Sequence, residues 1–243
     1  CSVEYVVFTS LKEMNKKVYS NFKKILFSKI GFKNNNYKNQ NKAPSIIFLS
    51  SGTTTDPKMI EIKQNNIISQ LYQIDDRLEI KKKVNLFTTM PCNHVSGLFF
   101  VFFNGIFFQK KIFISNYFSI NFFIEKINKR NIDFCFINPS ILSTIVEFIS
   151  YKLNNSKKLD ILCGSAPLSK THLKKFINII NCNFNQCYGL TETSNTLICM
   201  PSAMDNELKK KLYFNQKIPS IGQSLKNCKI KILVKNKFCN EQK

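Results

Sequence analysis

The sequence predicts an α/β fold built around a largely parallel sheet. Short apolar runs of strand length recur along the 243-residue chain, and segments with apolar residues at helical spacing separate them. Because parallel strands need crossover connections, which are usually helices, this alternation favours a parallel sheet over an antiparallel one. A hydrophobic content of 44% is ample for a packed core.

The first predicted element is an amphipathic helix over residues 10–29. Ser10 and Glu13 form a capping-box pattern at its start, and apolar residues follow at helical spacing: Leu11, Met14, Val18, Phe22, Ile25 and Leu26. The Asn/Lys-rich stretch 33–42 indicates an exposed loop. We therefore expect residues 1–40 to form an N-terminal helix and its exposed connection, ahead of the main domain at 41–243.

The main domain is predicted to alternate strands and helices. A helix over 64–78 follows from the spacing of Ile67, Leu71, Ile74 and Leu78, and a second helix begins near Pro139. Ser169 is placed to cap a third, which carries Leu173, Phe176, Ile177 and Ile180 on one face. Apolar runs predict strands at 45–49, 85–90, 111–115, 133–137 and 159–163. Residues 229–234 alternate lysine and apolar residues, which indicates a half-exposed strand outside the parallel sheet.

The charge is strongly basic but a weak guide to function. The formal net charge of +21 comes from 36 Lys+Arg against 15 Asp+Glu, which by itself would suggest a polyanionic partner. Yet only Arg77 and Arg130 are arginines, the residue that bidentate phosphate and base recognition favours. A lysine-rich solvated surface is the simpler interpretation, and a polyanion-binding face stays open as an alternative.

The nine cysteines indicate a reducing, cytoplasm-like compartment. They show no CxxC pair, and the two histidines, His94 and His172, give no zinc-ligand spacing. Cys135 and Cys163 lie within apolar runs, as small buried hydrophobic residues do. The most apolar segment, 97–108, is too short to span a bilayer and contains Asn104, so no transmembrane segment is expected.

Four loops that follow predicted strands carry the candidate functional residues, because ligands of α/β sheets bind at the carboxyl ends of strands. The first, SSGTTTDPK (50–58), could cradle phosphate oxygens with its hydroxyls, amides and lysine, or could be a turn that hydrogen-bonds to itself. The second, TTMPCNHVSGLF (88–99), contains His94, which is either a packing residue or part of a site.

The third and fourth loops are also ambiguous when each is taken alone. CGSAPLS (163–169) could let a flat ring approach the backbone, although small residues serve turn geometry equally often. QCYGLTETS (186–194) places a hydroxyl beside a carboxylate, which suits a metal ion and phosphate oxygens, yet Thr-Glu pairs are common.

In their order and spacing, SSGTTTDPK, PCNHVSG, GSAPLS and YGLTE resemble the core motifs of the adenylate-forming superfamily of AMP-dependent synthetases and ligases. The stretch 218–233 resembles the family segment that comes shortly after, so the resemblance covers roughly residues 44–234. It implies a layered αβαβα large domain with mostly parallel sheets. It also implies ATP-dependent activation of a carboxylic acid to an acyl-adenylate, with Mg²⁺ as metal and coenzyme A as the usual acceptor.

The resemblance assigns roles to individual residues. By the family pattern the phosphate-loop residues Ser50, Ser51, Gly52, Thr53, Thr54 and Lys58 would hold the β- and γ-phosphates. Gly164, Ser165, Ala166 and Pro167 would line the adenine pocket with Tyr188 and Gly189. Thr191 would reach the phosphates, Glu192 would hold Mg²⁺, and His94 would border the acyl pocket. Candidates for the wall of that pocket are Val95, Leu98, Phe99, Asn138 and Pro139.

The departures from the family pattern matter as well. Thr55 and Met59 stand where the family has glycine, and a β-branched residue is costly wherever φ must be positive. The family's ribose-binding aspartate, hinge and small C-terminal domain are not found in these residues, so a fragment of the large domain is expected. The leading hypothesis is an acid–thiol ligase of the acyl- or aryl-CoA synthetase kind. The alternatives are a catalytically impaired nucleotide-binding relative and a lysine-rich polyanion binder; the acid and the oligomeric state are not predicted.

Overall fold

The computed structural model describes most of the predicted main domain. The described residues are 5–8, 45–50, 58–92, 94–115, 118–129, 132–154, 157–234 and 237–239. The helix predicted over 10–29 and the loop at 33–42 lie outside them.

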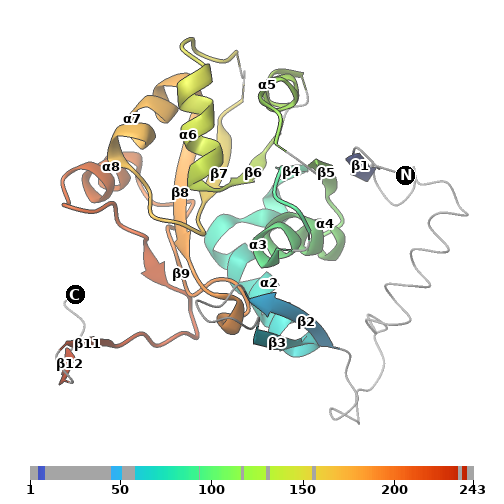
Figure 1. Ribbon diagram of the computed structural model, residues 1–243, viewed down its shortest axis with the longest axis vertical. Helices are drawn as coiled ribbons and strands as arrows, with labels where there is room; N and C mark the ends of the chain where they lie inside the picture. Colours follow the sequence, from blue (N-terminus) through green and yellow to red (C-terminus); the bar gives the residue numbers. More distant parts are fainter. Residues whose placement is uncertain are drawn as a thin grey trace, which may run out of the picture.

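A central sheet organises the described part of the chain (Figure 1). Its strands, in spatial order, are β1 (Tyr5–Phe8), β5 (Lys111–Ser115), β4 (Asn85–Thr88), β6 (Phe134–Ile137), β7 (Leu159–Cys163), β8 (Cys182–Tyr188), β9 (Ile198–Cys199) and β10 (Gln223–Ser224). The strands from β5 to β8 are mutually parallel, whereas β1, β9 and β10 pair antiparallel at the two edges. The prediction of an α/β fold with a largely parallel sheet is confirmed.

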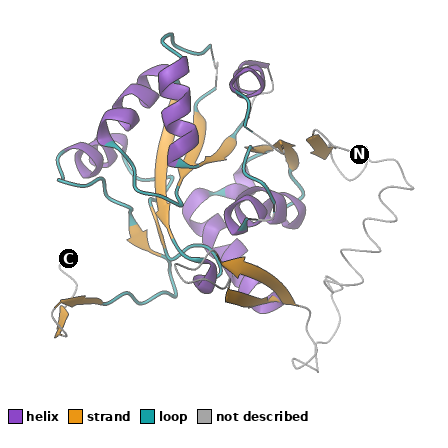
Figure 2. Cartoon of the chain, viewed as in Figure 1, coloured by secondary structure: helices purple, strands orange, loops and turns teal. Residues whose placement is uncertain are grey.

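The helical connections lie on both faces of this sheet. Between β4 and β5 the chain forms α3 (Val95–Gly97), the π-helical segment η3 (Leu98–Phe103) and α4 (Asn104–Phe107); the later crossovers are α5 (Ile120–Lys129), α6 (Pro139–Phe148) and α7 (Lys170–Ile179). Because β5 and β6 lie on opposite sides of β4, right-handed crossovers place α3 to α4 on one face and α5, α6 and α7 on the other. Figure 2 shows helices on both sides of the central strands.

Two smaller pairs of strands stand apart from the central sheet. β2 (Ser45–Ser50) and β3 (Lys58–Lys63) form an antiparallel hairpin, and α2 (Gln64–Leu78) follows β3 directly and leads into the short 3₁₀ helix η2 (Ile80–Lys82). β11 (Ile232–Val234) pairs with β12 (Lys237–Cys239). The strand predicted at 229–234 is therefore shorter than expected, but it does lie outside the parallel sheet.

The sequence patterns explain the local structure well. Strands β6 and β7 are buried along their whole length, as the central strands of a sheet covered on both faces must be. Helix α6 has Pro139 in its first turn, and the Asn138 side chain accepts a hydrogen bond from the Ile141 amide at 2.8 Å. Ser169 caps α7 as predicted, accepting from the His172 amide. α2 covers the predicted range, and β4 ends two residues earlier than predicted.

The sequence missed several elements for identifiable reasons. Strand β8 carries Asn183, Asn185 and Gln186, which make it resemble a polar loop, yet Asn185 is wholly buried. Helix α8 (Asn206–Phe214) is dominated by charged residues. Both elements are fixed by tertiary contacts, which override local propensity.

Asn104 has a structural role in the most apolar segment. Its buried side-chain amide donates to the carbonyl oxygen of Phe99 at 2.7 Å, at the point where η3 gives way to α4. A π-helical turn displaces carbonyls from their regular partners, and Asn104 supplies a donor there. No helix among the described residues is long and apolar enough to cross a membrane.

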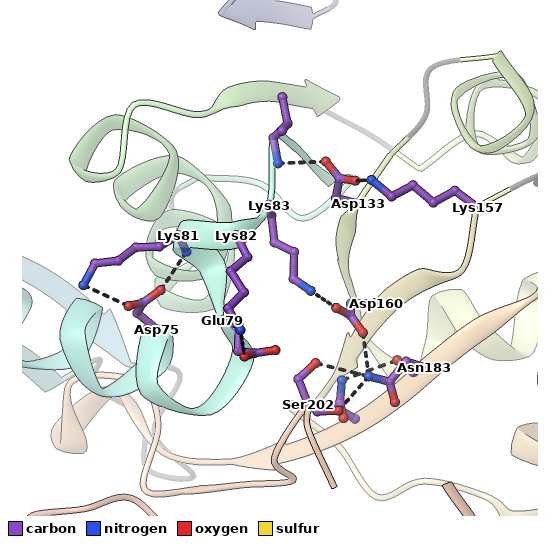
Figure 3. A network of polar contacts seen from close by, with 12 residues as sticks. Asp75, Glu79, Lys81, Lys82, Lys83, Asp133, Lys157, Asp160, Asn183 and Ser202 are labelled. Carbon is purple, nitrogen blue, oxygen red and sulfur yellow. Dashed lines mark hydrogen bonds and ion pairs between the residues drawn. The ribbon is translucent and has the colours of Figure 1, made fainter. Parts of the chain in front are cut away.

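The amino ends of the central strands are joined by a polar network (Figure 3). Asp133, just before β6, accepts hydrogen bonds from the amides of Val84 and Asn85 at 2.7 and 2.8 Å and pairs with Lys157. Burial opposes the charge of Asp133, but the hydrogen bonds from Lys157 and the two amides lower its pKa below the ordinary value. On β7, Asp160 pairs with Lys83. The network fixes β4 against β6 and β7.

Lys209 of α8 extends this network into the protein. Its ammonium group is buried and donates to Asn183 Oδ1 and Asn185 Oδ1, both at 2.7 Å, and to the carbonyl oxygen of Ser202 at 3.1 Å. These are neutral acceptors, and burial lowers the pKa of Lys209 to about 8. The Lys209 ammonium group thus anchors α8 to β8, although burial among neutral acceptors disfavours its charged form.

We predict that the free energy of unfolding depends on Lys209 above pH 8. Between the folded pKa of about 8 and the ordinary lysine value of 10.5, only the unfolded chain holds the proton, so stability should rise with pH, by up to about 3 kcal/mol. Urea denaturation of the wild type and of Lys209→Met at a series of pH values measures this slope. Lys210→Met, at an exposed neighbour, is the control; equal slopes for wild type and Lys209→Met would contradict the prediction.

Candidate functional site

The candidate site lies at the carboxyl edge of the sheet, opposite the polar network. The loops after β4, β6, β7 and β8 all begin at this edge because these strands are parallel. The connection from β4 turns to one face and that from β6 to the other, which makes this edge a topological switch point. In open α/β sheets a ligand-binding crevice forms at such a point.

The loop after β4 is shaped by His94 and Gly97. The exposed His94 is the N-cap of α3, where its Nδ1 accepts a hydrogen bond from the Ser96 amide at 3.2 Å. Nδ1 must be unprotonated to accept, and partial burial of the ring lowers the pKa of His94 below its ordinary value. A Cβ on Gly97 would lie 2.5 Å from the Pro91 carbonyl oxygen, so only glycine fits this turn.

The loop after β7 presents small residues to solvent. Ser165, Ala166 and Pro167 are exposed, whereas Gly164 is buried, and a Cβ there would lie 2.6 Å from Cys187 Sγ. The left-handed position in this turn belongs to Ser165, with φ of 77°. A non-glycine residue in that conformation stores strain of the kind found at functional sites.

The loop after β8 is closed by its own hydrogen bonds, and its candidate functional side chains are exposed to solvent. Thr193, at the end of the 3₁₀ turn η4 (Thr191–Thr193), binds both the amide and the carbonyl of Leu190 through its hydroxyl at 2.9 Å. Tyr188 is 45% exposed, and Glu192 is exposed on η4. The backbone of Asn195 lies so close to Gly189 that a Cβ on the glycine would be 1.6 Å from the Asn195 carbonyl oxygen.

Three of these loops meet at the hydroxyl group of Ser96. Ser96 Oγ lies 3.2 Å from Ser165 Oγ in the loop after β7 and donates to Asn195 Oδ1 in the loop after β8 at 3.5 Å. Both Ser96 and Asn195 are buried. Neither residue was a candidate from the sequence; their only signal there is that Ser96 lies between His94 and Gly97 and that Asn195 follows the YGLTE motif.

The hairpin of β2 and β3 packs beside the loop after β8. Ser50 and Lys58 face each other at its end, so residues 51–57 connect the two strands. β3 lies against η4, and Gln70 of α2 donates to the carbonyl oxygen of Thr196 at 2.8 Å. The hairpin and α2 therefore brace the loop after β8.

The structure reaches only part of the predicted phosphate loop. Ser51, Gly52, Thr53, Thr54 and Thr55 lie outside the described residues, so their roles stay predictions. Met59, which stands at a family glycine, lies in regular strand β3 opposite Leu49, with an exposed side chain and no positive φ. This position needs no glycine, so Met59 introduces no backbone strain.

Beside the hairpin, a small apolar cluster supports the second loop. Val95 and Phe99, predicted to border an acyl pocket, belong to this cluster, which joins the hairpin, α2, α3 and η3: Phe48, Ile62, Ile67, Leu71, Val95, Phe99 and Phe103. The ring of Phe99 is wholly buried and packs edge-on against Phe103 at 5.4 Å between centroids. In this structure Phe99 is a packing residue.

The donor chemistry near η4 fits one divalent cation held together with a phosphate ligand. Glu192 offers an exposed carboxylate, and Thr191 beside it a partly exposed hydroxyl-bearing side chain. Mg²⁺ is typically held by one or two carboxylates plus substrate phosphates and water, not by an all-protein cage. No group of three or more His, Cys, Asp or Glu side chains in the described ranges is arranged to hold a metal ion by itself.

Comparisons with known proteins identify relatives along nearly the whole chain. A family model described as "AMP-binding enzyme" matches residues 5–239. A phenylacetyl-CoA ligase of Aspergillus niger is 29% identical over 163 residues, which cover 64% of this chain and 30% of that protein. A 4-chlorobenzoate–CoA ligase of an Arthrobacter species is 22% identical over 184 residues, covering 74% and 35% of the two chains.

Solved structures share the fold. The o-succinylbenzoate CoA synthetase of Bacillus subtilis, determined with its acyl-adenylate intermediate, superposes with a TM-score of 0.67 at 21% identity, covering 81% of this chain and 38% of that chain. The same enzyme with ATP and magnesium ion gives a TM-score of 0.66. The chain thus spans about a third of the length of the curated relatives it matches.

We predict that Gly189→Ala destabilises the loop after β8. The added Cβ would overlap the Asn195 carbonyl oxygen, and overpacking of this kind costs about 1–3 kcal/mol. Leu190→Ala, at an exposed neighbouring position, should have a much smaller effect. Chemical denaturation of the two variants and the wild type makes the comparison, and equal stability of Gly189→Ala and Leu190→Ala would contradict it.

We also predict that His94 stabilises α3 only in its neutral form. NMR titration should give His94 a pKa below 6.5, so the cap is lost as the pH falls through that lowered value. His94→Ala should cost about 1 kcal/mol at neutral pH, whereas His94→Asn, which can still accept from the Ser96 amide, should cost less. A pKa at or above 6.5, or equal losses in both variants, would contradict the capping role.

Proposed function

Because this chain belongs to the AMP-binding enzyme family, we propose that the protein containing it activates a carboxylic acid with ATP, forming an acyl-adenylate and releasing pyrophosphate. The observation that carries the proposal is the meeting of three strand-end loops at Ser96. That contact brings the loops that carry His94, Ser165 and Glu192 together at one edge of the sheet, and a reaction between two bound substrates requires such convergence.

The adenine ring is proposed to bind between Tyr188 and the loop after β7. Gly164 keeps the backbone close to β8, and the exposed Ser165, Ala166 and Pro167 offer a flat surface without bulky side chains. The half-exposed ring of Tyr188 can stack on a nucleobase. In this proposal, Gly189 lets the chain turn directly after Tyr188, so that the Tyr188 ring and the residues of η4 contact the same bound nucleotide.

The phosphates are proposed to lie between η4 and the hairpin loop. Thr191 would donate to phosphate oxygens, Glu192 would hold Mg²⁺, and Ser50 to Thr54 with Lys58 would hold the β- and γ-phosphates. When bound, Mg²⁺ neutralises charge on the phosphates and so lowers the repulsion that an approaching carboxylate meets. The packing of β3 against η4 supports this assignment, because the predicted phosphate loop leads directly into β3.

The acid is proposed to approach past His94. A carboxylate oxygen attacks the α-phosphorus, and the bond from that phosphorus to the bridging oxygen of pyrophosphate breaks. A carboxylate needs no deprotonation at neutral pH, so His94 would position the acid and not act as a base. Its lowered pKa keeps it neutral and able to donate from Nε2. Val95, Leu98, Asn138 and Pro139 are proposed for the wall of the acyl pocket.

Transfer of the acyl group to coenzyme A is the proposed second step. Support comes from the named CoA ligases and CoA synthetase among the relatives, while the acid stays unassigned. The cysteines from Cys92 to Cys228 have free thiols, and the proposed location is the cytoplasm, whose reducing conditions favour free thiols.

A catalytically impaired nucleotide-binding relative is the second candidate function. It is favoured by Thr55, which stands at a family glycine in the phosphate loop. A binder of polyanions is less well supported, because only Arg77 and Arg130 are arginines, the residue that phosphate and base recognition favours.

We predict that Glu192→Gln in the intact protein lowers carboxylate-dependent exchange of pyrophosphate into ATP by about tenfold or more. The amide is a neutral and weaker ligand for Mg²⁺, so raised Mg²⁺ should restore part of the rate. Glu207→Gln, on the remote helix α8, is the matched control and should exchange normally. Unchanged exchange in Glu192→Gln would contradict the metal role.

The same assay separates the two candidate functions. If Thr55 prevents the phosphate loop from closing, the wild type should bind ATP without exchange, and Thr55→Gly should raise the exchange rate. An active wild type whose rate is unchanged by Thr55→Gly would show that threonine fits the loop.

A further inference from the structure

Cys187 and Cys199 lie directly opposite each other across the β8–β9 pair. The Met200 amide donates to the Gln186 carbonyl oxygen at 2.8 Å, one residue outside the pair on each strand. This pattern makes the two cysteines a non-hydrogen-bonded antiparallel pair, the closest side-chain position in a ladder, with Cα atoms about 4.5 Å apart.

The two thiol groups share one face of the sheet and are buried. Directly opposed residues of an antiparallel pair point to the same side, and Cys187 and Cys199 are 7% and 1% exposed. Burial raises the pKa of both thiols, and the neighbouring Cys199 and Cys163 raise that of Cys187 further. Cys187 Sγ lies close to Gly164, which follows β7 on the side of β8 away from β9, so the cross-link requires the Cys187 side chain to rotate toward β9.

The other cysteines near β8 are not equivalent partners. Cys163 of β7 is in register with Gln186, so its side chain lies on the face opposite that of Cys187. Cys182 is five residues earlier on β8 and pairs with Leu159. Within the described part of the chain, Cys199 is the partner that the sheet register selects for Cys187.

We propose that Cys187 and Cys199 are a disulfide modification site at the base of the loop after β8. A disulfide requires Cα atoms about 4.4–6.8 Å apart, a range that includes the expected separation of this pair. The oxidant is a low-molecular-weight disulfide: two S–H bonds break, one S–S bond forms between Cys187 and Cys199, and the oxidant takes up two electrons and two protons as two thiols.

Access to the thiols comes from the short strands at this edge. β9 and β10 are two residues long, so few ladder bonds hold β9 on β8. Opening of β9 exposes a thiol for the first exchange, and reclosure brings the second thiol to the mixed disulfide. Because both pKa values are raised, the reaction accelerates as the pH rises.

The cross-link would close the segment 188–198 into a covalent ring. That segment contains Tyr188, Gly189, η4 and Asn195, so its base would be held at the β8–β9 separation. Any effect of the cross-link on nucleotide affinity rests on the proposed function. Formation of the cross-link itself does not depend on that function.

Peptide mapping of the oxidised, folded protein tests the site. The protein is incubated with oxidised glutathione at pH 8.5, its remaining thiols are alkylated, and it is cut after glutamate. Cleavage after Glu192 separates Cys187 from Cys199, so a disulfide between them links two peptides that reduction releases. We expect this linked pair in the wild type and in Cys182→Ala, which removes another thiol from the Cys187 peptide.

Cys187→Ala and Cys199→Ala should each abolish the linked pair. Alanine is small and apolar, and circular dichroism of both variants checks that they fold; Cys135→Ala, at another wholly buried cysteine, is a second control that should keep the link. Alkylated Cys187 and Cys199 in the folded wild type, or Cys187 joined to Cys163, would overturn the proposal. Binding of ATP, measured before and after oxidation, is a separate readout: its absence in both states would count against the proposed function alone.

Discussion

The parallel pairing of β4, β6, β7 and β8 is the constraint on which the rest of the structure depends. It places the four carboxyl ends at one edge, so that residues distant in the chain become neighbours. The pairing is fixed at the opposite edge, where Asp133 binds the amides at the start of β4 and Asp160 pairs with Lys83. Buried carboxylates are tolerable there because each has amide or ammonium donors.

At the carboxyl edge of the sheet, close backbone packing, and not ion pairing, holds the loops together. Gly97, Gly164 and Gly189 each lie where a Cβ would overlap a neighbouring atom, so each loop is pressed against the next element. Ser96 then joins the loops through its hydroxyl. The result is a closely packed rim on which Ser165, Tyr188 and Glu192 are exposed, and the proposed function uses this rim to position two anionic substrates.

Much of the fold was accessible from local patterns. The helix at 64–78, the strands at 111–115 and 159–163 and the cap at Ser169 were predicted because apolar periodicity and capping chemistry are local properties. Strand β8 was missed because its buried amide side chains find partners only in the folded protein, as Asn185 does with Lys209. The candidate loops were found in order, but the roles of Ser51 to Thr55 lie beyond the described residues.

The sequence by itself determined the alternation of strands and helices, the small-residue turns and the motif order, since these depend on neighbours a few residues apart. Only the tertiary structure decided which loops meet. Ser96, Ser165 and Asn195 are separated by about a hundred residues from first to last, and no local pattern encodes their hydrogen bonds. The pairing of Cys187 with Cys199 was likewise set by strand register, because a shift of one residue would turn one thiol to the other face.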